Sequence, residues 1–242
     1  MDNFGRYIRQ RILFGELDDK IHESKVAVIG IGGIGSWVAE LLARIGVKKI
    51  ILADKDIVSL SDLHRQVYTE EDIGKYKVDA MENRLRNVNS QVEIETYKKF
   101  DEGNALEIFK KVDIVFDGTD NIETRYLINE ASVLTGKPWI FGTVTQFKGY
   151  AALINPEHFC FYDIFANKTP ELSCDTYGVC SAAVLFVASL EIKLFLQYLE
   201  GNFEPYIYHY DLKNMILEKI KVKRNPKCKI CVLRDFEYLK WI

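Results

Sequence analysis

The sequence lacks a long apolar run, a secretory signal and a large number of cysteines. Its most apolar stretch, residues 179–190, has 12 residues and is followed by Glu191 and Lys193, whereas a membrane-spanning helix needs about 20 apolar residues. We therefore expect a buried helix there and no membrane association. The first residues lack the basic-then-apolar pattern of a secretory signal. Five cysteines in 242 residues are typical of a reducing compartment, so we expect a cytoplasmic protein whose cysteines serve metal or thiol chemistry.

The sequence also lacks an excess of one charge. Its 32 Lys and Arg against 35 Asp and Glu give a net charge of -3, which favours neither a nucleic-acid partner nor a solvating acidic tail. There is no internal repeat, low-complexity tract or Pro/Gly/Ser-rich linker that would mark a domain boundary. We therefore expect residues 1–242 to form a single domain, with a change of pattern near residue 145 that divides it into halves of about 1–145 and 146–242.

Apolar runs alternate with helical patterns along the first half of the chain. Short apolar runs predict strands at 25–29, 49–53, 92–97 and 112–116, and apolar spacing predicts helices at 36–45, 72–87, 103–111 and 121–135. The second half predicts consecutive strands at 138–144 and 149–154, a long helix at 179–199, and a hairpin of 205–211 with 214–221. This order predicts an α/β fold with an open sheet, parallel at first and mixed or antiparallel later, and helices on both faces.

A glycine-rich loop follows the first strand. Residues 30–35 read Gly-Ile-Gly-Gly-Ile-Gly and place Gly30, Gly32 and Gly35 between a strand and a helix, where backbone N–H groups can receive a phosphate. Asp54 ends the next strand, 19 residues after Gly35, at the place where an acidic residue commonly binds ribose. We expect a Rossmann-like nucleotide site; the alternative is a loop that only permits tight packing. These residues do not separate a nicotinamide-dependent dehydrogenase from a nucleotide-using transferase.

The charged residues that follow help to distinguish a dehydrogenase from a nucleotide-using transferase. Arg65 and Lys77 come after the ribose carboxylate, and fixed cations serve the cleavage of a triphosphate better than hydride transfer; the alternative is solvated surface charge. Asp117 and Asp120 follow the strand at 112–116, so we expect both beside the nucleotide crevice, where a hard cation such as magnesium could bind. Alternatively, Asp117 is structural, and Asp120 or Asn121 caps the next helix.

Several motifs together carry a resemblance to a known family. They are Arg-Tyr-Ile-Arg-Gln at 6–10, the glycine loop at 30–35, Ser-Asp-Leu-His-Arg-Gln at 61–66, Asp-Gly-Thr-Asp-Asn at 117–121 with Arg125, and Arg-Asn-Pro-Lys-Cys-Lys-Ile-Cys at 224–231. In this order they resemble the ThiF/MoeB/HesA family, the ancestral form of ubiquitin-activating enzymes, over roughly residues 6–232. The resemblance implies ATP-dependent adenylation of the C-terminal glycine carboxylate of a ubiquitin-like sulfur carrier ending in Gly-Gly, with magnesium and release of pyrophosphate. It also implies a homodimer, and a second half that binds the carrier, in thiamin- or molybdopterin-type sulfur metabolism or in the activation of a ubiquitin-like protein.

The resemblance implies roles for individual residues. Arg9 would reach into the site of the other subunit, Arg65 and Lys77 would stabilise the triphosphate, and Asp120 would position magnesium. The implied nucleotide-binding set is Gly30, Gly32, Gly35, Asp54, Asp56, Arg65, Lys77, Asp120 and Asn121. One residue departs from the family pattern: Asp62 stands where an asparagine is usual, and its negative charge either coordinates metal or weakens ATP binding.

The cysteines give two further hypotheses. Cys228 and Cys231, just after Pro226, form one C-x-x-C half of a zinc site. The corresponding first half is Cys160 and Asp163, so a zinc site of three thiolates and one carboxylate is a hypothesis, with His158 as a substitute ligand; the alternative is reduced thiols that pack together.

Cys174 precedes the long helix and resembles a cysteine that some family members use to hold the activated carrier in a thioester or acyl-disulfide. The neighbouring Asp175 would raise the pKa of this thiol and lower its reactivity.

Alternative functions stay open at this point. An NAD(P)-dependent oxidoreductase would use the same glycine loop and Asp54. It would leave these residues without a role: Arg9, Arg65, Lys77 and Asp120. An inactive nucleotide-binding member of the family is suggested by Asp62 and by the incomplete cysteine set. Activation of a tRNA modification or of a small peptide is a further alternative, and no basic patch supports the tRNA acceptor.

Overall fold

A computed structural model describes residues 4–165 and 177–240 of the chain. In these residues eight strands form one sheet in the order β3-β2-β1-β4-β5-β6-β7-β8. The strands from β3 to β5 are parallel, and β6, β7 and β8 continue the sheet in antiparallel pairs. The strands are β1 (Lys25–Ile29), β2 (Lys49–Ala53), β3 (Glu93–Tyr97), β4 (Ile114–Asp117), β5 (Trp139–Thr145), β6 (Lys148–Ile154), β7 (Tyr206–Asp211) and β8 (Ile216–Lys221).

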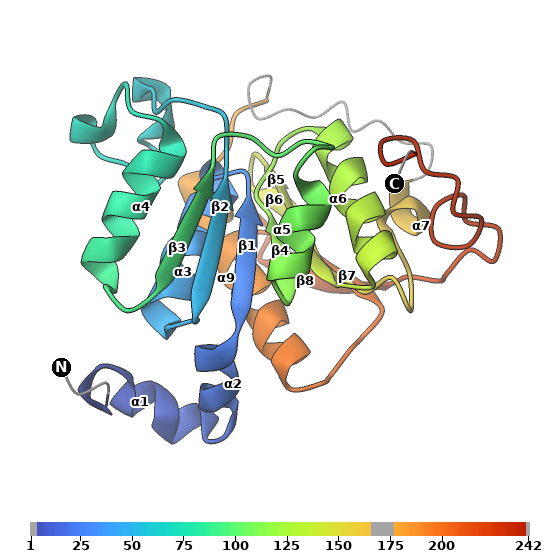
Figure 1. Cartoon of the computed structure of the whole chain (residues 1–242), viewed down its shortest axis with the longest axis horizontal. Coiled ribbons are helices and arrows are strands. Elements are labelled where there is room, and N and C mark those ends of the chain that lie inside the picture. The colour runs from blue at the N-terminus through green and yellow to red at the C-terminus, as the bar shows by residue number, and fades with distance from the viewer. Residues whose placement is uncertain (1–3, 166–176, 241–242) are drawn as a thin grey trace.

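Helices cover both faces of the sheet (Figure 1). The helices of the described residues are α1 (Phe4–Phe14), α2 (Leu17–Glu23), α3 (Gly33–Ile45), α4 (Lys77–Val88), α5 (Ala105–Lys111), α6 (Ile122–Thr135), α7 (Phe161–Phe165) and α9 (Ser181–Leu199), with short 3-10 helices η1 (Leu60–Asp62) and η2 (Glu70–Asp72).

The alternation of apolar side chains along the central strands explains this layering. In β1, Val26 and Val28 belong to the apolar cluster beneath α3, α4 and α9, whereas Ala27 and Ile29 belong to the cluster beneath α5 and α6. Successive side chains of a strand point to opposite faces, so a strand that is apolar throughout is buried on both sides. The predicted α/β fold, with its change from parallel to antiparallel strands, is confirmed.

The apolar run before Glu191 forms the first part of α9. This helix is long and apolar enough to cross a membrane by length and composition. Here it packs against α3, β5 and β6 and buries Val184, Val187 and Leu194 completely or nearly so. It is a core helix of the fold, as its interruption by charged residues predicts.

The structure differs from the prediction at the start of α4 and at the amino terminus. The helix expected at 72–87 begins at Lys77, because Asp72 instead completes the capping box of η2 and accepts hydrogen bonds from the backbone N and the hydroxyl of Thr69 at 3.1 Å each. Gly74, at φ +87°, then reverses the chain, a conformation that glycine adopts without strain. Helices α1 and α2 have no counterpart among the predicted elements, and the strand expected at 112–116 lies at Ile114–Asp117.

Candidate active site

A cleft of about 1040 Å³ lies at the carboxyl ends of the parallel strands. Strand order changes direction between β1 and β4, and in open α/β sheets ligands bind in the crevice at such a switch point. The walls come from the glycine loop after β1, residues 54–66 after β2, the loop after β4, and the start of α9. Chain segments that are far apart in sequence therefore meet at one edge of the sheet.

Close packing shapes the glycine loop. Gly30 has φ +80°, and a Cβ atom there would lie 2.8 Å from the carbonyl carbon of Gly118. A Cβ atom on Gly35 would lie 1.9 Å from the carbonyl oxygen of Gly30. Gly30 and Gly32 line the cleft, but Gly35 is not among its lining residues. The structure thus gives Gly35 a packing role between the loop and α3, while the first two glycines expose backbone to the cleft.

Asp54 joins the glycine loop to the end of β2. Its Oδ2 accepts a hydrogen bond from the backbone N of Ile31 at 2.6 Å, and its Oδ1 accepts one from the backbone N of Asp56 at 2.8 Å. Burial raises the pKa of this carboxyl above its ordinary value, and the two backbone hydrogen bonds and the charge of Lys77 oppose that rise. Each carboxylate oxygen can accept a further hydrogen bond, so Asp54 can fix the loop and still meet ribose hydroxyls.

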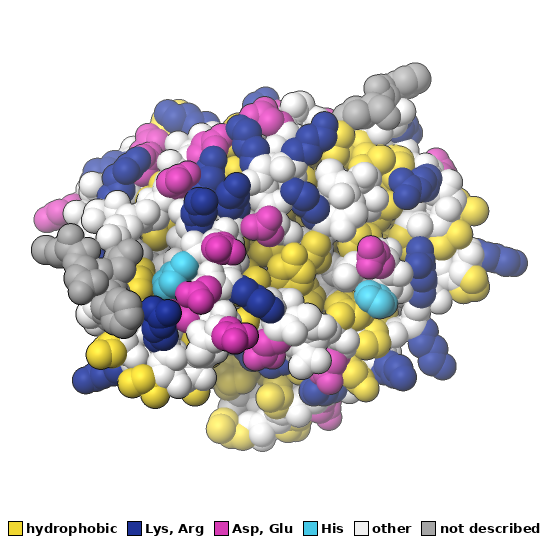
Figure 2. All heavy atoms as spheres, turned by 60° about the horizontal axis from the view of Figure 1, so that its bottom comes forward, with side chains coloured by type: hydrophobic (Ala, Val, Ile, Leu, Met, Phe, Trp, Pro, Cys, Tyr) yellow, Lys and Arg dark blue, Asp and Glu magenta, His cyan; other side chains and the backbone are white. Residues whose placement is uncertain are grey.

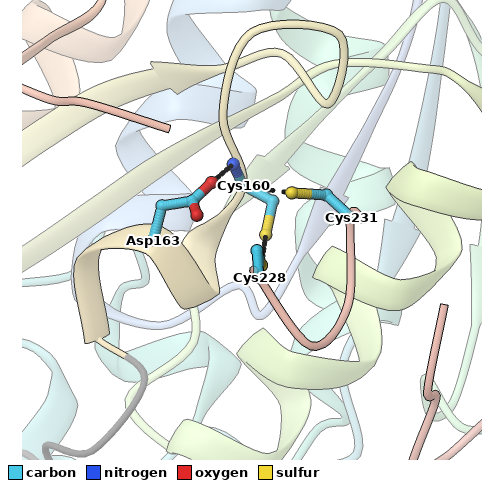
Figure 3. Close-up of side chains that lie close together, drawn as sticks. All are labelled: Cys160, Asp163, Cys228 and Cys231. Carbon is cyan, nitrogen blue, oxygen red and sulfur yellow. Dashed lines mark hydrogen bonds between the residues drawn. The ribbon is translucent and has the colours of Figure 1, made fainter. Parts of the chain in front are cut away.

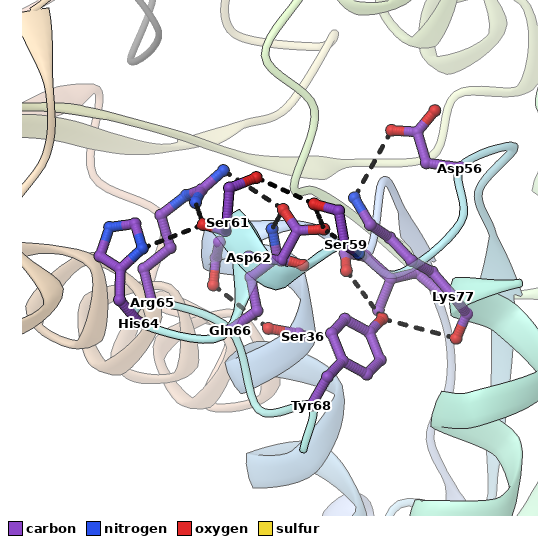
Figure 4. A network of polar contacts seen from close by, with 12 residues as sticks. Ser36, Asp56, Ser59, Ser61, Asp62, His64, Arg65, Gln66, Tyr68 and Lys77 are labelled. Carbon is purple, nitrogen blue, oxygen red and sulfur yellow. Dashed lines mark hydrogen bonds and ion pairs between the residues drawn. The ribbon is translucent and has the colours of Figure 1, made fainter. Parts of the chain in front are cut away.

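Cationic side chains occupy the wall beyond Asp54 (Figure 4). Arg65 donates a hydrogen bond from Nη1 to the carbonyl of Ser61 at 2.6 Å. Lys77 is buried at the start of α4, with its Nζ 3.5 Å from Oδ2 of Asp56. Lys99, which the sequence analysis did not single out, also lines the cleft. Its position just after β3, at the same edge of the sheet, is the signal that could have identified it.

The two carboxylates expected after β4 have different environments. Asp117 is fully buried and pairs with Arg125, whose Nε lies 2.9 Å from Oδ2. Oδ1 of Asp117 accepts hydrogen bonds from the backbone N and the hydroxyl of Thr119. Burial raises the pKa of Asp117, and Arg125 opposes that rise. The expectation that Asp117 lies beside the crevice is therefore wrong, because this carboxylate holds the loop from inside the protein.

Asp120 and Asn121 do line the cleft. Asp120 is exposed, so its oxygens are accessible to a cation. Asn121 caps α6 by accepting a hydrogen bond from the backbone N of Thr124 at 2.9 Å. The buried pair beneath them and the helix cap fix the position of this loop.

One predicted catalytic residue, Arg9, lies elsewhere. Arg9 is exposed on α1 and is not among the residues that line the cleft of the same chain. Helix α1 lies at the end of the sheet opposite to the cleft (Figure 1). Cys174 and the neighbouring Asp175 fall outside the described residues.

A cysteine cluster lies away from the cleft (Figure 3). Ligand atoms of Cys160, Asp163, Cys228 and Cys231 all lie within 4.8 Å of one another. Tetrahedral zinc with Zn–S bonds of about 2.3 Å would place its ligands roughly 3.8 Å apart, so these donors are close enough and chemically suitable. The ring of His158 stacks on Phe203 at 4.2 Å between centroids, and it takes no part in the cluster.

Hydrogen bonds already order this cluster. Oδ2 of Asp163 accepts a hydrogen bond from the backbone N of Cys160 at 2.8 Å, and Oδ1 accepts one from that of Asn225 at 3.0 Å. Burial raises the pKa of the Cys160 thiol, and raises that of Cys231 to about 11. A bound cation would reverse this effect because metal coordination favours the thiolate.

The fold and the cleft define a class of nucleotide-binding α/β proteins in which a glycine loop, a ribose-side acid and several cations share one crevice. The chain belongs to the ThiF family, which matches residues 6–230. This confirms the family resemblance inferred from the sequence motifs.

Known proteins resemble the chain over almost its whole length. It is 36% identical over 247 residues to the sulfur carrier protein adenylyltransferase of Thermus thermophilus, covering 95% of this chain and 91% of that one. It is 32% identical to the sulfur carrier protein ThiS adenylyltransferase of Bacillus subtilis, covering 98% and 74%. The crystal structure of E. coli MccB with ATP has the same fold, with a TM-score of 0.81 at 21% identity, covering 95% of this chain and 75% of MccB.

Proposed function

We propose that the chain is an adenylyltransferase that uses ATP to activate the C-terminal glycine carboxylate of a ubiquitin-like sulfur carrier ending in Gly-Gly. One observation carries the proposal: Gly30, Asp54, Arg65 and Lys77 line a single cleft in a chain 36% identical to a sulfur carrier protein adenylyltransferase. The named relatives are adenylyltransferases, and they support this activity over the oxidoreductase alternative. Thiamin- or molybdopterin-type sulfur metabolism, or activation of a ubiquitin-like protein, is the proposed setting.

The residues of the cleft suit each part of ATP. Gly30 and Gly32 line the cleft at the start of α3, where the helix dipole favours anions. The N–H of Gly30 donates to the carbonyl of Ala53 at 2.8 Å, so Gly32 is the glycine of this pair whose N–H faces the phosphates. Asp54 accepts hydrogen bonds from the ribose, with Asp56 and Asn121 nearby on the cleft wall. The volume of about 1040 Å³ also leaves room for the end of a carrier tail, because ligand sites commonly measure about 300–1,000 Å³.

Adenylation then needs positioning and charge stabilisation rather than a covalent enzyme residue. An oxygen of the glycine carboxylate attacks the α-phosphorus, the bond between that phosphorus and the bridging oxygen to the β-phosphate breaks, and pyrophosphate leaves. Arg65 and Lys77 stabilise the negative charge that develops on the phosphates. Asp120 would hold a magnesium ion, which would neutralise part of the phosphate charge. Cys174 stays a proposed thiol for the activated carrier.

We further propose a structural zinc ion held by Cys160, Asp163, Cys228 and Cys231. The ion would tie the segment at 160–163 to the one at 228–231, two parts of the chain that lie far apart in sequence. A site with three thiolates and one carboxylate, without an open position for substrate, fits a structural role rather than a catalytic one.

The proposed assembly is a cytoplasmic homodimer of one-domain subunits, with a nucleotide half of about 1–145 and a carrier half of about 146–242. Arg9 lies between Ile8 and Ile12 in the sequence, and these two side chains are 56% and 82% exposed on α1. If a partner subunit buried them, the guanidinium of Arg9 would also lie against that partner.

Mixing inactive Arg9→Ala and Arg65→Ala variants tests the proposal, because a mixed dimer regains one complete site. No recovered activity in a confirmed mixed dimer would refute sharing of Arg9.

A nucleic-acid partner is not part of the proposal. On the face turned forward in Figure 2, Lys and Arg side chains are interspersed with Asp and Glu. Nucleic-acid binding relies on a basic patch that neutralises phosphates.

ATP–pyrophosphate exchange tests the proposed activity. We expect exchange with magnesium and an intact Gly-Gly carrier, and none with a carrier that lacks the two glycines. Asp120→Ala should lower the exchange rate by about 10²-fold or more. The matched control is Asp79→Ala, because Asp79 is a 53% exposed carboxylate outside the cleft. Equal exchange with and without the two carrier glycines, or normal exchange in Asp120→Ala, would contradict the proposal. ATP binding without any exchange would favour an inactive member of the family.

A further inference from the structure

The cleft that would receive the phosphates also contains a buried carboxylate. Asp62, at the end of η1, is 6% exposed and lines the cleft together with Arg65 and Lys77. An anionic ligand would therefore meet a fixed negative charge in the same wall as the cations.

The contacts of Asp62 exclude a role as a metal ligand in this conformation. Its Oδ2 accepts hydrogen bonds from the backbone N and the hydroxyl of Ser59, both at 2.9 Å. Its Oδ1 accepts one from Nε2 of Gln66 at 2.7 Å and lies 3.4 Å from Nη2 of Arg65 (Figure 4). A carboxylate has about four lone-pair sites, and each of them faces a protein donor. Asp62 therefore acts on a ligand through its charge and through its hold on Arg65.

This charge acts unequally on the two forms of a nucleoside triphosphate. A bound divalent cation cancels two of the negative charges of the phosphates, so a neighbouring carboxylate repels the metal-free form more strongly. Asp62 is largely shielded from solvent, which leaves this repulsion less screened than that of a surface carboxylate. The partial neutralisation of Arg65 by Asp62 works in the same direction, because it weakens the attraction for the more highly charged form.

We propose that Asp62 makes the cleft selective for the magnesium complex of the nucleotide over the metal-free nucleotide. The inference rests on the proposed function in that the cleft binds ATP. Asp62 is then a positioning residue that sets the selectivity for the magnesium complex through its charge and its contact with Arg65.

The test measures the dissociation constants of ATP with excess magnesium and with a chelator, by calorimetry on the full chain. For the wild type we expect tighter binding of the magnesium complex. In Asp62→Asn, the ratio of the metal-free to the magnesium-complex dissociation constants should fall by about tenfold, mainly because metal-free ATP binds more tightly. Asp62→Glu keeps the charge while disturbing the cap, so its ratio should stay near that of the wild type even where its stability falls.

The second 3-10 helix supplies a matched control. Asp72 completes a capping box with Thr69 in η2, as Asp62 does with Ser59 in η1. Asp72 also pairs with Lys75 at 3.1 Å, but it does not line the cleft. Asp72→Asn should leave the ratio unchanged. An unchanged ratio in Asp62→Asn, or an equal fall in Asp72→Asn, would overturn the inference, whereas absence of ATP binding by the wild type would overturn the proposed function itself.

Discussion

Glu191 is a buried carboxyl whose replacement by glutamine should stabilise the protein as pH rises. It lies on α9 with no exposed surface, and both of its oxygens are without a hydrogen-bond partner among the described residues. It faces Gly142 of β5, where a Cβ atom would lie 1.8 Å from Oε1. Burial raises the pKa of Glu191 well above its ordinary value of 4.5, Asp117 raises it further, and Arg125 lowers it.

The sign of the effect follows from proton linkage. Below the ordinary value of 4.5, Glu191 is neutral in the folded and the unfolded chain, so Glu191→Gln should match the wild type. Above it, the unfolded chain releases the proton and the folded chain keeps it, so the wild type loses up to about 1.4 kcal/mol of stability for each pH unit. Between pH 5 and pH 7 the variant should therefore gain roughly 2–3 kcal/mol relative to the wild type.

Urea unfolding at half-unit pH intervals from 5 to 8 measures this difference. Glu200→Gln is the control, because Glu200 is exposed at the end of the same helix and its loss should give no pH-dependent gain. A difference between Glu191→Gln and the wild type that stays constant with pH, or a variant that is less stable at pH 8, would refute the buried protonated carboxyl.

Three further predictions concern the supports of the site. Arg125→Met leaves Asp117 as an unpaired buried charge and should lower the free energy of unfolding by about 3–5 kcal/mol, measured by urea denaturation; a loss below about 1 kcal/mol would contradict the buried pair. Gly35→Ala places a Cβ atom 1.9 Å from the Gly30 carbonyl oxygen, so ATP binding measured by calorimetry should weaken strongly, and unchanged affinity would show that the loop tolerates the clash. Asp163→Ala should lower the zinc content measured by atomic emission from about one ion per chain, and a wild type purified without zinc under metal-replete conditions would refute the proposed metal site.

Local chemistry made the first strand–helix–strand unit predictable. The apolar run of β1, the glycines after it and the helical spacing of α3 each act over a few residues, and the observed bounds follow them closely. Asp54 was predictable for the same reason, since it directly follows the strand β2. The boundary at Asp72 was missed because a capping contact to Thr69 competes with the start of a helix, although the Thr-x-x-Asp spacing is visible in the sequence.

Long-range packing determines the burial of acidic side chains that the sequence does not distinguish. Asp117 is the last residue of β4 and is buried in a pair with Arg125, whereas Asp120, three residues later, lies in the cleft. Glu191 ends an apolar run in the sequence, yet the missing side chain of Gly142 makes room for its carboxyl in the core. The sequence around these acidic residues does not indicate which of them are buried and which line the cleft.

In the proposed reaction, the cleft joins the α-phosphate of ATP to a carrier carboxylate. Intact mass spectrometry tests it most directly, using a ubiquitin-like sulfur carrier ending in Gly-Gly, magnesium, ATP and pyrophosphatase. We expect the carrier to gain the mass of one adenylyl group with the wild type and much more slowly with Arg65→Ala, and a carrier lacking its two glycines to stay unmodified. A carrier that forms a complex with the ATP-bound protein but never gains the adenylyl group would contradict the proposed adenylation.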